Sequence, residues 1–214
     1  MTGDAGILHD AGTAALGRGS IGEATAFLLA AKRIDPRAGD IRRNLAIAER
    51  TVAAARGEEL PPMPRGPAVA LSAAEGWWLA AILVALGAAA GIAAIVRSER
   101  RLPAGRLAGW LPRGAAAGIA AGLLLAAWLA AGAVSERRHP EAVVVAMSVE
   151  ARSGVDEAPR APILMRAGER ARAGRVHGDD VEVIIGGSPV GWVPQAALWN
   201  VADAPRYTAG FRSR

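Results

Sequence analysis

The 214-residue chain has no cysteine, a single lysine and few aromatic residues. Without cysteine, the chain has no disulfides, no thiolate metal site and no cysteine nucleophile. Aromatic residues make up only 4% of a chain that is 52% hydrophobic, so small aliphatic residues supply most of the apolar content. The 26 glycines mean that a short glycine motif can arise from composition alone.

The formal net charge of +5 comes from the middle of the chain. Residues 61–140 carry 8 basic and 3 acidic side chains, whereas basic and acidic residues balance on either side. A nucleic-acid-binding protein concentrates basic residues on a folded domain. Here the basic excess lies in the most hydrophobic third of the sequence, a distribution that predicts a membrane protein.

Two segments without any charge, 77–96 and 114–134, carry the membrane prediction. At about 1.5 Å per residue, a helix of either length spans the hydrocarbon core of a bilayer. A pair of buried helices in a soluble protein is the alternative, but such helices normally keep a polar face. Glycines recur at every fourth position, at Gly87 and Gly91 and at Gly114, Gly118 and Gly122. This spacing indicates either close helix packing in lipid or a compositional accident, and both interpretations stay open.

The orientation follows from the loop between the two segments. Residues 97–113 hold five arginines and one glutamate. By the positive-inside rule, this loop faces the cytoplasm and both ends of the chain lie on the other side of the membrane.

The N-terminal stretch from Gly17 contains a G-x-G-x-x-G spacing, but the residues before it predict a helix rather than a strand. A dinucleotide site needs a strand there, so nucleotide binding is excluded. Ser20 and Glu23 have the spacing of a capping box for a second helix, which stops at Asp35-Pro36. The sequence therefore predicts two helices joined by a glycine turn.

Residues 1–56 resemble a tetratricopeptide (TPR) repeat followed by the first helix of another, a unit of about 34 residues. The matching residues are Gly12, Gly19, Ala24, Leu28, Ala31, Ile34-Asp35-Pro36 and Asn44-Leu45-Ala46. Leu8 and Ala15 stand where the family often has aromatic residues. An unrelated three-helix segment is the alternative. Residues 57–76 begin with a Pro-rich stretch and are expected to form an extended linker.

Residues 141–202 change to short β-branched runs separated by turns, which predicts a small all-β barrel. The sequence of this region resembles the bacterial SH3-like (SH3b) domain in three motifs: Val149–Gly154, Arg166–Glu169 and Gly191-Trp192-Val193-Pro194. The signature residues are Arg152, Gly154, Gly168, Gly191, Trp192 and Pro194, and we expect Trp192 to be largely buried. A second tryptophan of that family is missing near Asp179-Asp180. Residues 203–214 are expected to form a tail.

No catalytic chemistry is evident in the sequence. The three histidines, His9, His139 and His177, are far apart and lack the spacing of metal ligands. No P-loop and no nucleophile paired with a base occur. We therefore expect neither an enzyme nor a bound cofactor or metal.

The order of TPR-like helices, two membrane helices and SH3b-like strands resembles the BatE family of aerotolerance-operon proteins. Members of that family are encoded with von Willebrand A-type membrane proteins and MoxR-type ATPases. The resemblance implies a multi-pass protein of the bacterial inner membrane whose soluble domains lie in the periplasm. It further implies a scaffold that binds envelope proteins in a stress-tolerance complex, with no nucleic acid and no small-molecule substrate.

Two function classes remain open: an adaptor that binds other envelope proteins, and a protein that binds or senses a cell-wall peptide. The array of about one and a half repeats is short, and no signal peptide precedes it. These features predict a start further upstream or a partner that completes the array. The expected groove of the TPR-like part could hold an acidic peptide or could be a solvated face. Its residues are His9, Thr13, Arg43, Asn44, Ile47 and Arg50.

Overall fold

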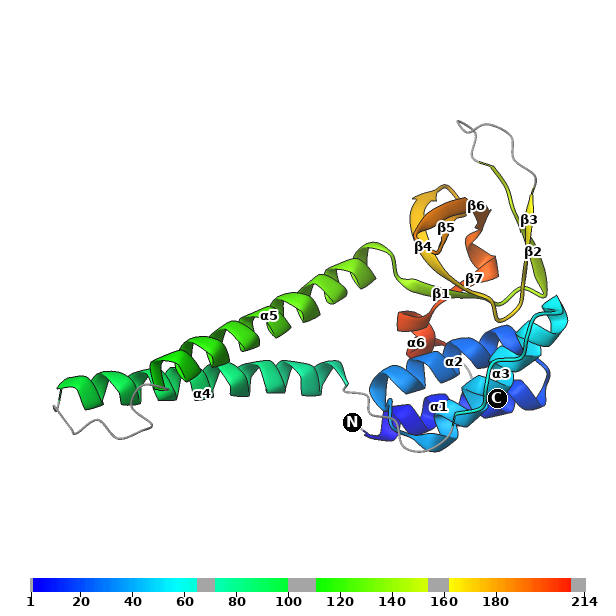
Figure 1. Ribbon diagram of the computed structural model, residues 1–214. Coiled ribbons are helices and arrows are strands. Elements are labelled where there is room, and N and C mark those ends of the chain that lie inside the picture. The colour runs from blue at the N-terminus through cyan, green and yellow to red at the C-terminus, as the bar shows by residue number, and fades with distance from the viewer. Residues whose placement is uncertain (1, 65–71, 100–110, 154–161, 209–214) are drawn as a thin grey trace. The chain divides into compact units, whose positions relative to one another are not determined.

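The computed structural model describes residues 2–64, 72–99, 111–153 and 162–208 (Figure 1). It divides into two units, which are described separately. Residues 1–70 and 136–214 form the first unit, here called the composite body because it joins both ends of the chain. Residues 71–135 form the second, here called the apolar hairpin.

The composite body begins with three helices, α1 (Thr2–Gly17), α2 (Ile21–Ile34) and α3 (Gly39–Arg56). Gly19 turns the chain between α1 and α2 with a φ of 74°, which a residue without Cβ adopts at little cost. After α2, the Asp35 carboxylate accepts hydrogen bonds from the backbone N–H groups of Arg37 (3.1 Å) and Ala38 (3.2 Å). The predicted helix–turn–helix is therefore present.

Helices α1 and α2 approach each other closely at Gly12. A Cβ at this position would lie 2.7 Å from Cγ of Leu28, so only glycine fits without a shift of the neighbour. The expected packing residues of α2, Ala24, Leu28 and Ala31, are fully buried. The small residues at the helix crossing thus allow the close contact that the sequence pattern predicted.

The predicted capping box at the start of α2 is wrong. Ser20 precedes the helix but makes no side-chain capping hydrogen bond, and Glu23 instead pairs with Arg18 at 3.2 Å. A capping box does occur before α4 (Ala73–Glu99), where the Ser72 N–H donates to the Glu75 carboxylate (2.8 Å) and the Glu75 N–H donates to Ser72 Oγ (3.3 Å). The same Ser-x-x-Glu pattern therefore forms a capping box at Ser72 but not at Ser20.

The C-terminal part of the composite body is an antiparallel β region. A five-stranded sheet has the order β6-β5-β4-β1-β7, and β2 pairs with β3 in a separate ribbon. The strands are β1 (Glu141–Val144), β2 (Ser148–Ala151), β3 (Ile163–Arg166), β4 (Arg170–His177), β5 (Asp180–Ile185), β6 (Ser188–Pro194) and β7 (Leu198–Asn200). Short 3₁₀ turns, η1 (Gln195–Ala197) and η2 (Val201–Asp203), flank β7.

The predicted hairpin at Gly186-Gly187 is present. Both glycines have positive φ, 62° and 85°, and Ile185 pairs with Ser188 across the two-residue turn. Between the ribbon and the sheet, the described residues show a bridge between Arg152 and Trp192. The β region is thus antiparallel as expected, whereas a closed barrel is not seen.

The helices and the strands of the composite body share one core. Val143 of β1 and Val201 of η2 pack with the buried faces of α1, α2 and α3, and the Phe27 ring meets Trp199 edge-on with centroids 5.7 Å apart. The contact is also close at the backbone, because a Cβ on Gly22 would lie 2.5 Å from the Val144 carbonyl oxygen. A second core lies inside the β region and includes Val144, Met165 and Val183 among its residues.

The expected tail at residues 203–214 is partly wrong. A short helix, α6 (Ala204–Thr208), begins there, and Ala204 is fully buried in the core of the helices. The burial of Ala204 directly after η2 was not evident from the sequence alone. The residues after 208 lie outside the described part of the chain.

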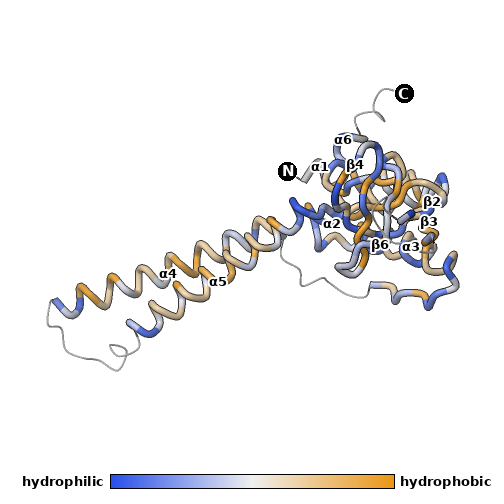
Figure 2. The backbone as a smooth tube through the Cα atoms, turned by 90° about the horizontal axis from the view of Figure 1, so that it is seen from above, coloured by the Kyte–Doolittle hydropathy of each residue, from blue (hydrophilic) through white to orange (hydrophobic). Residues whose placement is uncertain are grey.

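The apolar hairpin consists of α4 (Ala73–Glu99) and α5 (Leu111–Arg138), both long and apolar enough to span a membrane (Figure 2). Their large side chains point outward: Trp78, Leu124 and Trp128 are 71%, 72% and 72% exposed. The interiors of soluble proteins bury such residues. The large apolar side chains of the hairpin are therefore not buried as they would be in two core helices of a soluble protein.

Glycines line the contact between α4 and α5. A Cβ on Gly87 would lie 2.8 Å from the Ala115 carbonyl oxygen, and one on Gly122 would lie 2.9 Å from that of Ala80. Gly118 faces Gly87 at a similarly short distance, and Gly91 makes an ordinary contact with Ala115. The last glycine of the predicted pattern, Gly114, has nothing near it. Close helix packing thus accounts for most of the spacing, though not for all of it.

Candidate functional site

The structure brings three of the six predicted groove residues together. The Asn44 amide of α3 donates to Thr13 Oγ1 of α1 at 2.9 Å and lies 3.1 Å from Nε2 of His9. Thr13 in turn donates to the His9 carbonyl oxygen at 2.9 Å. These contacts join α1 to α3, the two helices that the sequence predicts to be the first helices of successive repeats.

Two carboxylates stand beside this cluster. His9 Nδ1 lies 3.6 Å from Asp10 and 3.9 Å from Asp40, and both aspartates are well exposed. Negative charge so close to His9 opposes the binding of a carboxylate there. The structure thus offers no support at this end of the groove for the acidic peptide that the sequence suggested.

The remaining three groove residues are not gathered into one site. Arg43 and Ile47 are exposed on α3, whereas the Arg50 guanidinium donates to the carbonyl oxygen of Pro61 at 2.7 Å. That bond holds the Pro-rich linker against α3. Arg50 is therefore engaged with the linker, whereas Arg43 and Ile47 remain as an exposed pair one turn apart.

Two of the SH3b-signature glycines have clear structural roles. Gly168 has a φ of 88°, and a Cβ there would lie 2.5 Å from Cγ2 of Val52, so the β3–β4 turn packs directly on the helices. A Cβ on Gly191 would lie 2.8 Å from the Arg152 carbonyl oxygen, where β6 meets the end of β2. Pro194 is exposed at the end of β6, and Gly154 lies outside the described residues.

Trp192 is partly buried, and alternation along β6 directs its neighbour Val193 into the core and Trp192 to the other face. There its ring lies 5.7 Å from the Arg175 guanidinium and edge-on to His177. Its backbone N–H donates to the Arg152 carbonyl oxygen at 2.7 Å.

A buried carboxylate, Glu182, lies on the same face of the sheet. The Arg175 guanidinium donates to both of its oxygens, at 2.7 and 3.1 Å, and the Arg175 backbone N–H donates at 3.3 Å. These hydrogen bonds, more than offsetting the opposing effect of burial, lower the pKa of Glu182. The pair was not predicted, because strand alternation placed Glu182 outward and gave no sign that Arg175 would cover it.

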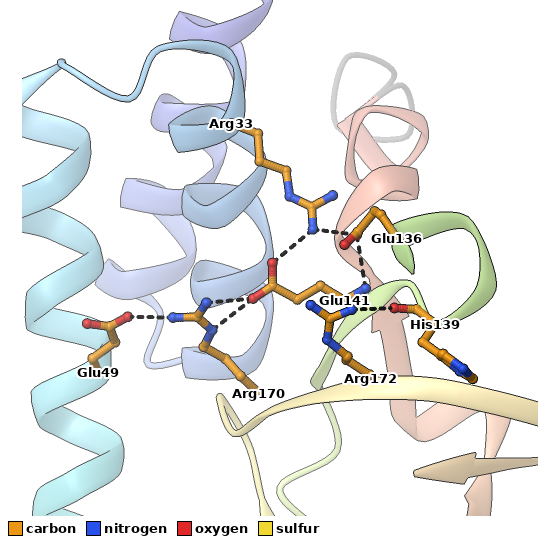
Figure 3. A network of polar contacts seen from close by, with 7 residues as sticks. All are labelled: Arg33, Glu49, Glu136, His139, Glu141, Arg170 and Arg172. Carbon is orange, nitrogen blue, oxygen red and sulfur yellow. Dashed lines mark hydrogen bonds and ion pairs between the residues drawn. The ribbon is translucent and has the colours of Figure 1, made fainter. Parts of the chain in front are cut away.

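A second charged network centres on Glu141 at the start of β1 (Figure 3). Its carboxylate accepts from Arg33 of α2 at 2.9 Å and from Arg170 of β4 at 2.7 Å. Arg33 also donates to Glu136 at 2.6 Å, and Arg170 to Glu49 of α3 at 3.3 Å. The network therefore joins two helices to the two neighbouring strands.

Glu141 is ionised in this setting. Burial alone would raise its pKa, but the hydrogen bond from Arg33 and the charge and hydrogen bonds of Arg170 outweigh burial and lower it. Arg172 extends the network by donating to the His139 carbonyl oxygen at 3.4 Å. The arginines that sequence analysis left unassigned thus hold the two ends of the chain together.

In the described part of the chain, no three acidic or histidine side chains gather in a way that could hold a metal ion. Comparison with family models, with curated proteins and with solved structures found no match to this chain.

Proposed function

We propose that the protein is a non-catalytic adaptor, anchored by the apolar hairpin, whose composite body binds other proteins of the bacterial envelope. One observation carries the proposal: residues before and after the two apolar helices fold into one body with a shared core. Val143 and Ala204 pack among the helices of residues 2–56, and Glu141 binds Arg33. The hairpin thus interrupts a single body in the sequence and gives it an anchor.

The shared core also supports the expected topology. Polar, folded segments do not rest within hydrocarbon, so both halves of the composite body must lie on one side of a bilayer. Two crossings return the chain to its starting side. The five arginines of residues 97–113 then favour a cytoplasmic loop and a composite body on the periplasmic side.

The proposal assigns a TPR-like unit to the N-terminal helices and an SH3-like domain to the strands. The α1–α2 hairpin with close packing at Gly12 supports a TPR-like unit. The strand order β6-β5-β4-β1-β7, with a 3₁₀ turn before the last strand, supports an SH3-like β domain. With these modules, the resemblance to BatE proteins suggests von Willebrand A-type and MoxR-type partners in the inner membrane.

The partner surface that we favour is the exposed part of α3 around Arg43 and Ile47. Ile47 is 43% exposed although it is a large apolar residue. The β region contacts α2 at Gly22 and α3 at Val52, whereas Arg43 and Ile47 remain exposed. Arginine is enriched at protein-binding surfaces, and the centre of such a surface is more apolar than its rim.

A photo-crosslinking amino acid at position 47 tests this surface in cells. We expect crosslinks to envelope proteins at position 47, reduced by Arg43→Ala, and none from the same probe at the exposed Lys32. Equal crosslinking at both positions would contradict an adaptor surface on α3. Retention on purified cell-wall material, with no protein crosslinks, would favour wall binding instead.

Topology has its own test. Phosphatase fusions are expected to be inactive at Gly105 and active at Arg214. Activity at Gly105 with none at Arg214 would invert the orientation without affecting the shared core.

A further inference from the structure

A cavity of about 530 Å³ in the composite body lies between the bulge in β4 and the segment from η1 to η2. Its lining includes Val176, Asp179, Leu198, Trp199 and Asp203. The volume falls in the range of about 300–1,000 Å³ that is typical of small-ligand sites. Its lining includes Pro194 of the SH3b signature and Asp179, near which that family's second tryptophan is missing.

The charged side chains that line the cavity are all acidic. Among its lining residues in the described chain, the only charged side chains are Asp179 and Asp203. The bulge in β4 contributes to this: Gly174 and Val176 line the cavity, while Arg175 between them turns to Glu182 on the other face. A protein of net charge +5 therefore has a cavity whose own charged groups are both acidic.

The walls are positioned by contacts outside the cavity. The Trp199 ring is held edge-on by Phe27 at a centroid distance of 5.7 Å, and Leu198 is nearly buried. The turn that carries Asp179 is fixed to η1, because the Gln195 N–H donates to the Asp179 carbonyl oxygen at 2.8 Å. An aromatic ring and alkyl walls next to carboxylates suit an organic cation with an alkyl stem.

Asp203 already receives a guanidinium from the chain itself. Arg206 lies 3.0 Å from its carboxylate, but the Arg206 side chain is 83% exposed. The amide of Asn200 orients the same carboxylate at 3.4 Å. Such an exposed pair contributes little free energy, so an incoming cation can replace Arg206 at small cost.

We propose that this cavity binds an alkylguanidinium or alkylammonium group, with Asp179 and Asp203 pairing with the charge and Trp199 contacting the cation or its stem. The group could be an arginine or lysine side chain of a partner or a free diamine. The apolar walls favour such a group over a metal ion, which needs several oxygen ligands. The proposal does not depend on the adaptor function, since the cavity is separate from the Arg43–Ile47 surface.

The test uses the full chain in detergent micelles, titrated with acetyl-arginine amide and followed by NMR of the Trp199 indole N–H. The neutral isostere acetyl-citrulline amide is the ligand control. We expect saturable shifts with the arginine compound only. Asp179→Asn or Asp203→Asn should weaken binding about tenfold, since each removes one charged pairing partner.

Asp180→Asn is the matched control variant, because Asp180 is the exposed neighbour of Asp179 and does not line the cavity. It should bind as the parent does, and Arg206→Ala should bind a few-fold more tightly because the competing guanidinium is gone. Titration with putrescine distinguishes the sources: stronger binding of acetyl-arginine amide indicates a protein side chain, and stronger binding of putrescine indicates a free amine.

Equal shifts with the citrulline compound, or unchanged affinity in Asp179→Asn, would overturn the proposal. Because Asp179 is exposed in a turn, its substitution leaves the cores intact. The absence of any shift with all three compounds would overturn it as well.

Discussion

The composite body buries large side chains in its interior, whereas the apolar hairpin places glycines at the contact between its helices. In the body, Phe27 and Met165 are fully buried. In the hairpin, Gly87 and Gly118 lie at the helix contact, whereas Trp128 points outward. Water drives large apolar groups inward. Hydrocarbon provides no such drive, and helices in it associate through small residues that let backbones approach.

Charge follows the same division. The composite body keeps arginines and glutamates in paired networks such as that of Glu141, whereas residues 77–96 and 114–134 contain none. The two parts of the chain thus differ both in the size of the side chains that they place inside and in charge, and the two helices of the hairpin are long and apolar enough to span a membrane. Four predictions test this division, from the largest expected effect to the smallest.

Phe27→Ala should destabilise the composite body by about 3–5 kcal/mol, because it leaves a cavity in the core shared by helices and strands. Hydrogen exchange read by mass spectrometry should show faster exchange in residues 21–34 and also in residues 170–185. Trp78→Ala, which removes an exposed side chain of the hairpin, should leave both segments protected. Faster exchange in α2 alone would show that the two halves are independent domains.

Gly87→Leu should separate α4 from α5, because any Cβ at this position meets the backbone of α5. The chain has no cysteine, so an introduced pair contains its only thiols. A Cβ at Gly91 would lie 3.7 Å from that of Ala115, a suitable spacing for a disulfide between cysteines at these positions. We expect the disulfide to form on mild oxidation and to be lost with Gly87→Leu.

The matched control for the hairpin is Gly132→Leu, since nothing lies within 4 Å of a Cβ at Gly132. It should leave the disulfide intact. Disulfide formation that persists with Gly87→Leu would mean that the glycine contact does not hold the helices together.

Gly22→Ala should destabilise the composite body by about 1–3 kcal/mol, because the added methyl group overlaps the backbone at Val144, the last residue of β1, and at Val145. Alanine is the better helix former, so a purely local effect would have the opposite sign. Gly17→Ala, at the open end of α1, gives that local effect as a control. Urea unfolding of the full chain in micelles measures both changes. Equal stabilisation by the two substitutions would refute the close contact between α2 and β1.

Glu141→Gln should cost about 1–2 kcal/mol at neutral pH, a modest value because Arg33 and Arg170 are partly exposed. The pKa of Glu141 is lower in the folded state than its ordinary value of 4.5. Its contribution is therefore present above that value and is lost as the pH falls through the folded pKa. Parent and variant should converge in urea midpoint at low pH. A constant difference from pH 7 to pH 3 would contradict the assignment.

Glu58→Gln is the control for that series. Glu58 pairs with Arg56 at 2.8 Å, but both side chains are about half exposed. Its substitution should change stability little at any pH.

Local sequence patterns predicted the elements of the fold well. Apolar periodicity located α1 to α3, the uncharged stretches located α4 and α5, and the glycine pair located the β5–β6 turn. These features depend on neighbours in the sequence, since turn conformation and helix amphipathicity are set within a few residues.

Features that depend on distant partners were missed. The side of the sheet on which Trp192 lies depends on which face of β6 meets the core. The partners of Glu141 lie more than 25 residues away, at Arg33 and Arg170. Ala204 was placed in a tail because nothing in its own surroundings indicated a core beyond the β region. Pairing across such separations has no local signal in one sequence.

The contact of Phe27 with Trp199 has a consequence for how the protein is made. A chain is synthesised from its N-terminus, so the helices of residues 2–56 exist before β1, β7 and α6. Their apolar face has no covering strands until both helices of the hairpin have been made and residues 141–204 have followed. The composite body can therefore be completed only after the hairpin has been synthesised. An unfinished chain therefore exposes the apolar surface of these helices, and a chaperone or a protease can bind that surface.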